Sequence, residues 1–168
     1  MTFTGTSIDL NRLSACPFGI TTVQTLRPVA ETLVVEIGGE PIWVPEENRG
    51  LYHAALTFGA NNLMTLVTQT TELLEAAGIT NPEDLVTPLL SASLDNALRN
   101  GDAAITGPVA RGDAGTVREH LRVLANFDPA VSQAYRAMAR LTAIRALASG
   151  TLQPQLAEEL LIVLADES

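Results

Sequence analysis

The chain has 168 residues, a net charge of −9 and a hydrophobic fraction of 46%, so it is long and apolar enough to bury a core. All its basic residues are arginines and they form no cluster, so we expect it to bind neither nucleic acid nor an anionic membrane. The absence of lysine also excludes Schiff-base chemistry by this chain.

Cysteine and histidine usage narrows the possible chemistry further. Cys16 is the single cysteine, and the two histidines are far apart in the sequence, so we expect neither a disulfide within the chain nor a bound metal. No apolar run reaches the roughly 18 residues of a transmembrane helix, and the chain opens without a signal-peptide pattern. These features predict a cytoplasmic protein with no membrane-spanning segment.

Residues 1–46 predict a strand, a helix and a second strand in succession. We expect a short strand at 17–22, an amphipathic helix at 21–39 that ends at a Gly-Gly pair, and a strand at 40–46. The apolar positions of this segment recur at helical spacing: Leu26, Val29, Ala30, Leu33 and Ile37. A helical crossover joins parallel strands, and one such unit is too small to be a domain. Residues 1–46 therefore predict the C-terminal end of a larger α/β domain, or a sheet that is completed in some other way.

Residues 47–168 are predicted to be helical throughout. The first helix, 47–78, would be roughly 40 Å long, which predicts packing against something large such as another subunit. The next helix is expected to start with Asn81 as its N-cap and to kink near Pro88. Three more helices are expected at 113–126, 128–149 and 153–165, the last with an apolar face at Leu156, Leu160, Leu161 and Leu164.

A polar stripe runs along the predicted long helix. His53, Thr57 and Asn61 are spaced four residues apart, which places them on one face among apolar neighbours. Uncharged polar groups on such a face can orient a small polar molecule, and His53 is the main acid–base candidate because imidazole titrates near neutral pH. The alternative is an ordinary solvated helix face. His120 lies among charged residues and is expected to be exposed.

The segment at 104–113 combines several special residues between two predicted helices. Gly107 allows close approach of a ligand to the backbone, Pro108 stiffens the turn, and Thr106 adds a hydroxyl. The Arg111 guanidinium can bind a carboxylate or phosphate through two hydrogen bonds, and the N–H groups at the start of the next helix can add to an anion site. The alternative is a plain helix connection that ends in an aspartate N-cap.

Two segments together resemble a known family. LYHAALTFGANNLMTLV at 51–67 and AITGPVARGDAGTVREHL at 104–121 resemble proteins with an N-terminal Rossmann-like NAD(P)-binding domain and a C-terminal helical domain, called domain of unknown function 2520. That helical domain is similar to the C-terminal dimerisation domain of 6-phosphogluconate dehydrogenase-like enzymes. The resemblance covers roughly residues 18–149. It implies a mainly α fold, with a multi-helix domain at 47–168 preceded by a βαβ remnant of a Rossmann-like domain at 1–46.

The resemblance also implies a function. The chain would be the substrate-binding and dimerisation part of an NAD(P)-dependent oxidoreductase that acts on a small carbonyl or imine compound bearing a carboxylate. Matching positions imply catalytic roles for His53, which would transfer a proton, and Asn61, which would orient the substrate. The substrate-binding positions would be Thr57, Thr106, Gly107, Pro108 and Arg111.

The cofactor and partners follow from the same resemblance. NADP is expected in a full-length parent, whereas no G-x-G occurs in this chain, so we expect no cofactor to bind to it alone. The opening MTFTGTS resembles the stretch that follows the cofactor motif in full-length relatives. The expected partners are a second copy of the chain, bound through the helical domain, and a small anionic substrate. The alternative function is a non-catalytic helical module for dimerisation or ligand sensing.

Overall fold

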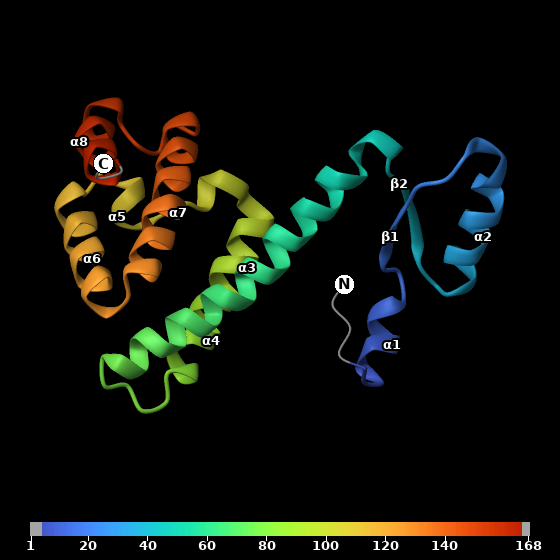
Figure 1. The fold of residues 1–168 in the computed structure, drawn as a ribbon, viewed down its shortest axis with the longest axis horizontal. Helices are drawn as coiled ribbons and strands as arrows, with labels where there is room; N and C mark the ends of the chain where they lie inside the picture. Colours follow the sequence, from blue (N-terminus) through green and yellow to red (C-terminus); the bar gives the residue numbers. More distant parts are fainter. Residues whose placement is uncertain (1–4, 166–168) are drawn as a thin grey trace. The chain divides into compact units, whose positions relative to one another are not determined.

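The computed structural model describes residues 5–165, apart from the side chains of residues 8, 10 and 11, so part of the opening MTFTGTS lies outside the described residues. Its elements are α1 (Ile8–Leu13), β1 (Pro17–Ile20), η1 (Gln24–Leu26), α2 (Arg27–Glu36), β2 (Glu40–Trp43), η2 (Glu46–Asn48), α3 (Arg49–Ala76), α4 (Glu83–Asn100), η3 (Gly101–Ala104), α5 (Gly107–Ala110), α6 (Ala114–Phe127), α7 (Pro129–Ala148) and α8 (Pro154–Leu164), where η marks a 3-10 helix (Figure 1). The predicted fold class is confirmed: the described chain is mainly helical and has a strand–helix–strand unit near its N-terminus, after the short helix α1.

The chain divides into two compact units, Met1–Thr65 and Leu66–Ser168. The boundary between them falls inside α3, so this helix begins in the first unit and ends in the second. The boundary expected from the sequence, between residues 46 and 47, stays a prediction.

The first unit is built around two parallel strands. Pro17 of β1 lies opposite Glu40 of β2, and the register continues to Ile20 opposite Trp43, which confirms the predicted strand–helix–strand order. The helix starts later than expected, at Arg27 rather than near residue 21, because Thr21 remains beside the strands and donates its hydroxyl to the Val44 carbonyl at 2.7 Å. Pro28 then favours the first helical turn.

The apolar positions that predicted α2 are largely exposed in the described chain. Leu26, Val29, Leu33 and Ile37 are all more than half exposed, and Val34 is the buried residue of this helix. A sheet of two strands is too narrow to cover this apolar stripe. The sequence pattern also missed the short helix α1, in which the Asp9 carboxylate accepts a hydrogen bond from the Gly5 amide at 2.8 Å.

Helix α3 is a single helix of 28 residues, as predicted, and is roughly 40 Å long. None of its residues is buried within the described chain. It also carries no Asp, Glu or Arg from residue 51 to residue 71. A surface helix ordinarily buries one apolar face against the core, so α3, which buries no residue, differs from a typical surface helix.

Helix α4 begins one residue later than expected. Its N-cap is Pro82, and Asn81 contributes its backbone carbonyl, which accepts from the Asp84 amide at 3.3 Å. The predicted side-chain cap by Asn81 is therefore wrong. The helix continues through Pro88 to Asn100, so this proline does not end it.

Helices α5 to α8 form a small bundle with its own core. The buried apolar residues are Val109, Ala114, Val117, Leu121, Ala139, Ala143, Ala146, Leu152, Ala157, Leu160 and Leu164. All three buried alanines on α7 lack bulk, which lets neighbouring helices approach closely. Two of the predicted face residues of α8, Leu160 and Leu164, are fully buried, but Leu156 is half exposed because the helix turns Ala157 inward instead.

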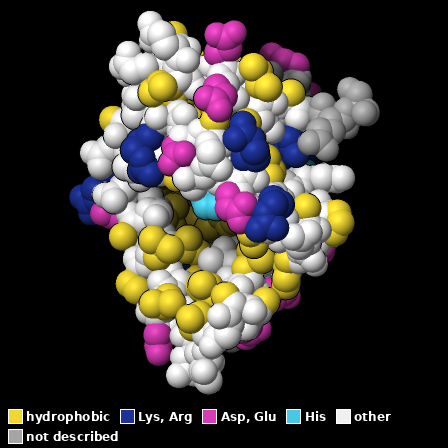
Figure 2. Space-filling model, turned by 90° about the vertical axis from the view of Figure 1, so that its left-hand side faces the viewer, with side chains coloured by type: hydrophobic (Ala, Val, Ile, Leu, Met, Phe, Trp, Pro, Cys, Tyr) yellow, Lys and Arg dark blue, Asp and Glu magenta, His cyan; other side chains and the backbone are white. Residues whose placement is uncertain are grey.

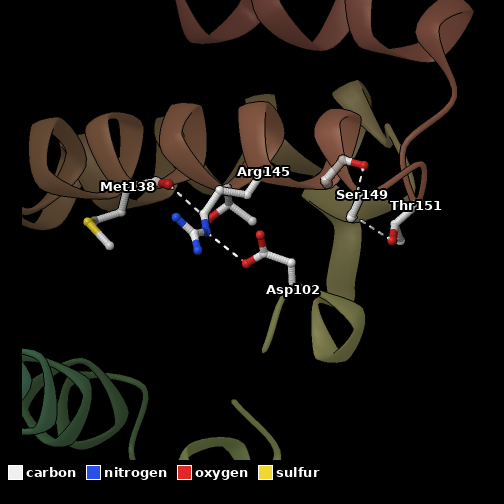
Figure 3. A network of polar contacts seen from close by, with 7 residues as sticks. Asp102, Met138, Arg145, Ser149 and Thr151 are labelled. Carbon is white, nitrogen blue, oxygen red and sulfur yellow. Dashed lines mark hydrogen bonds and ion pairs between the residues drawn. The ribbon is translucent and has the colours of Figure 1, made fainter. Parts of the chain in front are cut away.

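Polar contacts fasten the elements of this bundle together. Arg136 donates to the carbonyls of Val163 and Ala165, both at 2.8 Å, and so satisfies acceptors at the C-terminal end of α8. The Arg145 guanidinium of α7 pairs with the Asp102 carboxylate of η3 at 2.8 Å (Figure 3). This second contact ties the segment that follows α4 to α7.

Candidate functional site

The predicted polar stripe exists as one face of α3. His53, Thr57 and Asn61 are all exposed, and their side chains make no hydrogen bond within the described residues. Thr65 continues the stripe and donates its hydroxyl to the Asn61 backbone carbonyl at 3.2 Å. The three side chains are therefore free to contact a ligand, although the same exposure suits a solvated face.

An open cavity places His53 beside the two strands. The cavity has a volume of about 710 Å³ and lies at the carboxyl ends of β1 and β2, with Ile20, Thr21, Val44, Arg49 and Tyr52 in its wall. The Tyr52 ring lies against β1, where a Cβ on Gly19 would come within 2.5 Å of it. Ligands of α/β proteins bind outside the carboxyl ends of parallel strands, so this cavity is the main candidate site of the first unit.

The sequence analysis missed the other residues of this cavity. Thr21 and Val44 directly follow the two strands, and Arg49 is the first residue of α3. Their positions after the strands were visible in the sequence. The parallel arrangement was also predicted, and it brings both strand ends to one edge; what the sequence did not show is that Arg49 and Tyr52 would pack beside that edge.

A smaller cavity of about 290 Å³ lies at the same edge and is lined by Thr22, Arg27, Trp43 and Glu47, among others. The Arg27 guanidinium stacks over the Trp43 ring, 4.6 Å from its centre. The indole N–H of Trp43 donates to the Glu31 carboxylate at 3.1 Å. Because carboxylates and a guanidinium both border this cavity, it favours neither sign of charge strongly.

The segment predicted as a binding loop forms a compact turn in the second unit. Thr106 precedes α5 in an extended conformation, Gly107 follows with φ +91°, and Pro108 fits the first turn of this short helix. Val109 is buried in the bundle core and anchors the turn. Arg111 is exposed at its end. The polar groups of the segment are thus held at the surface of a rigid corner.

The residues that follow serve mainly to start α6. Gly112 has φ +70°, and a Cβ at this position would lie 2.5 Å from the Leu156 Cβ, so both its backbone and its packing require glycine. The Asp113 carboxylate accepts from the Thr116 amide at 3.0 Å and from the Thr116 hydroxyl at 2.7 Å, which confirms it as the N-cap. Those two bonds lower the pKa of Asp113, and nearby Arg111 lowers it further. The start of α6 therefore already holds an anion, which weakens the expected contribution of its N–H groups to a substrate site.

The predicted site residues thus fall into two groups. His53, Thr57 and Asn61 share one face of α3 in the first unit, and residues 106–111 share one turn in the second unit.

His120 takes no part in either group. It is exposed, as expected, and its Nδ1 lies 2.9 Å from the Tyr135 hydroxyl, with the two rings edge to face. Partial burial raises the pKa of Tyr135.

Across the described residues, no three His, Cys, Asp or Glu side chains are grouped to hold a metal ion, and no helix is both long and apolar enough to cross a membrane.

One face of the molecule carries contiguous apolar patches. Figure 2 shows the arginine side chains in its upper half, beside acidic and some hydrophobic ones, and the larger hydrophobic patches in its middle and lower half, where a few acidic side chains also lie. The lower half is the level at which α3 turns into α4 in Figure 1. Exposed apolar patches of this kind mark surfaces that bind another molecule.

The comparison with protein families accounts for most of the chain. The family Domain of unknown function (DUF2520) matches residues 16–142, which include β1, the whole of α3 and the turn at 106–111. The chain belongs to this family. A search of curated proteins finds no match.

Two solved structures share the fold. Protein TM1727 from Thermotoga maritima superimposes with a TM-score of 0.73 at 23% identity, over 88% of this chain and 60% of that one. BF3122 from Bacteroides fragilis, which carries the provisional name NADP oxidoreductase, superimposes with a TM-score of 0.64 at 26% identity, over 76% of this chain and 49% of that one. The DUF2520 chain described here thus spans about half to three fifths of the length of these two structures.

Proposed function

We propose that this chain is the substrate-binding and dimerisation part of an NADP-dependent oxidoreductase that acts on a small carbonyl or imine compound bearing a carboxylate. The observation that carries the proposal is the likeness to BF3122, which is provisionally named an NADP oxidoreductase, over 76% of this chain. The cavity beside His53 supports it, because this cavity lies at the strand edge where α/β proteins bind ligands.

Each group of residues would have a distinct task. The His53 imidazole would transfer a proton to or from the carbonyl oxygen or imine nitrogen, while Thr57 and Asn61 on the same face would orient the substrate by hydrogen bonds. The Arg111 guanidinium and the Thr106 hydroxyl would hold the carboxylate. Gly107 and Pro108 would fix the backbone from which those two groups project.

The residues of this chain fit one end of the cofactor. When bound, NADP supplies or accepts the hydride, and the 710 Å³ cavity with Thr21 and His53 in its wall could receive a nicotinamide ring. The dinucleotide phosphates have no such site, since the sequence contains no G-x-G turn. The phosphate contacts are therefore assigned to parts of a full-length parent that this chain does not span.

Turnover measurements test the proposal. The purified protein, in the longest form that cells make, would be assayed for NADPH oxidation with small 2-oxo acids and cyclic imino acids. We expect His53→Ala to lower kcat at least about 100-fold, because general acid–base groups contribute factors of this size. His120→Ala is the matched control and should keep full activity, since His120 lies outside both groups. Unchanged turnover in His53→Ala would remove His53 from the mechanism.

A second experiment tests the carboxylate contact. Arg111→Gln should raise KM for the acid about 10- to 100-fold with a smaller effect on kcat, because a charge-assisted hydrogen bond is lost. Arg118→Gln changes another exposed arginine, paired with Glu159 at 3.5 Å, and should leave KM unchanged. Equal KM values for both variants would argue against a role for Arg111.

The alternative function is a non-catalytic module that dimerises or senses a ligand. The observation that favours it is the start of α6, where Asp113 already occupies the position in which a substrate anion would bind. Saturable binding of a small carboxylate without any NADPH oxidation would support this alternative over the enzyme.

A further inference from the structure

Helix α7 has two apolar faces, and the described chain covers one of them. Its inner face, with Ala139, Ala143 and Ala146, is buried in the bundle. Its outer face carries Met138, Leu141 and Ile144, whose side chains are 54%, 49% and 53% exposed. Ala134 and Ala137 share this side of the helix and are also exposed, so another helix could approach α7 closely there.

This outer face is nearly free of charge. Arg145 is the one charged residue of α7 that borders it, and its guanidinium is neutralised by Asp102 at 2.8 Å (Figure 3). Arg136 and Arg140 donate instead to carbonyls at the end of α8. In a chain with a net charge of −9, a surface whose bordering carboxylate is paired with an arginine allows two copies to meet without strong repulsion.

Helix α3 offers a surface of the same kind. Residues 51–71 contain no Asp, Glu or Arg, and Leu66 and Val67 are exposed in the second unit. Exposed apolar side chains of this kind, beside the polar stripe of the same helix, mark a surface that another protein segment can cover. The bulky side chains of α3 are complementary in size to the alanines on the outer face of α7.

We propose that a second copy of this chain covers the outer face of α7 with its own α3. The inference rests on the homodimer in the proposed function and specifies its contact surface. In a twofold dimer each copy contributes both surfaces, so the α3–α7 contact occurs twice. Helix α7, with 20 residues, is roughly 30 Å long, and a helix is about 10 Å wide, so the two contacts cover roughly 600 Å² of each copy. That footprint is close to the 800 Å² or so that a standard interface buries on each partner.

The mass in solution, measured by light scattering or sedimentation at about 10 μM, tests the surface. We expect wild type to have about twice the chain mass of 17.8 kDa. Leu141→Glu should weaken association at least about 100-fold, because it places a charge in the contact, while circular dichroism stays unchanged. Ile162→Glu is the control, since Ile162 is 69% exposed on α8 and lies outside the proposed contact; it should remain dimeric.

The outcomes separate the two proposals. A monomeric wild type would overturn both the homodimer and its contact surface. A dimeric wild type with a dimeric Leu141→Glu variant would overturn the α7 surface and leave the homodimer standing.

A mixing experiment tests whether α3 is the element that covers α7. Leu66→Arg should be monomeric by itself, as should Leu141→Glu, but an equimolar mixture should form dimers. In the mixed dimer one α3–α7 contact is wild type, and the other carries two charges of opposite sign rather than an unpaired one. A mixture that stays monomeric, or a dimeric Leu66→Arg variant, would overturn the assignment of α3.

Discussion

The α6–α8 bundle and helix α3 are similar in apolar content and opposite in burial. Each bundle helix turns one apolar face into a common core, whereas α3 buries no residue within the described chain. The difference teaches that an apolar pattern identifies a face that is stabilised by burial. The chain itself buries such a face only where another of its elements packs against it. The bundle is therefore expected to hold most of the intrinsic stability, and α3 to depend on a partner.

The largest expected effect tests the bundle core. Leu160→Ala should lower the free energy of unfolding by about 3 kcal/mol, because Leu160 is fully buried and its loss leaves a cavity. Ile162→Ala on the same helix should change it by less than about 0.5 kcal/mol, because that side chain is exposed. Urea unfolding followed by circular dichroism measures both. Similar losses in the two variants would contradict the burial pattern of α8.

A glycine pair tests how tightly the 106–113 corner packs on the bundle. Gly112→Ala should cost about 2–3 kcal/mol, since the new Cβ would meet the Leu156 Cβ at 2.5 Å and φ is +70°. Gly150→Ala is matched in backbone conformation, with φ +78°, but has no atom near its Cβ, so it should cost only about 1 kcal/mol. The difference in urea midpoint between the two variants checks the packing term, and its absence would show that the corner is loose.

The N-cap of α6 should make bundle stability depend on pH. The pKa of Asp113 is lowered in the folded state by its two bonds to Thr116, so its stabilisation is full above the unfolded pKa and is lost as pH falls through the folded pKa. Asp113→Asn should therefore lower Tm at pH 6, and the difference from wild type should shrink once pH falls below about 4. Thermal unfolding at several pH values measures this. A constant difference at all pH values would exclude the charge as its cause.

The smallest expected effect concerns the link between η3 and α7. A double-mutant cycle of Asp102→Asn and Arg145→Gln should give a coupling of about 0.5 kcal/mol, because this ion pair is exposed. High salt should reduce it. A coupling above about 2 kcal/mol would mean that the pair is shielded, as it would be by a covering partner.

Features that depend on near neighbours in the sequence were predicted well. Asp113 was expected to cap α6 and does so, because the cap needs only the amide three residues ahead. The single long helix α3 and the parallel strands around α2 also follow from local periodicity and are confirmed.

Features that depend on contacts between residues far apart in the sequence were not predicted. The spacing of Leu26 and Leu33 predicted a helix, yet spacing does not reveal that the sheet of the described residues has two strands and leaves these side chains exposed. Arg49 and Tyr52 were missed as cavity residues, because their place depends on the strand register. The polar groups at 106–111 lie at a surface corner, whose position depends on the burial of Val109 among residues far away in the sequence.

Trp43 gives the protein a built-in optical probe. It is the single tryptophan of the chain, it belongs to the first unit, and its indole is held by Arg27 and Glu31 at the rim of the smaller cavity. Its fluorescence therefore reports on the strand edge, while far-ultraviolet circular dichroism is dominated by the long helices. Coincident unfolding curves from the two signals would show that the two units melt as one cooperative body, and separate curves would show that they melt independently.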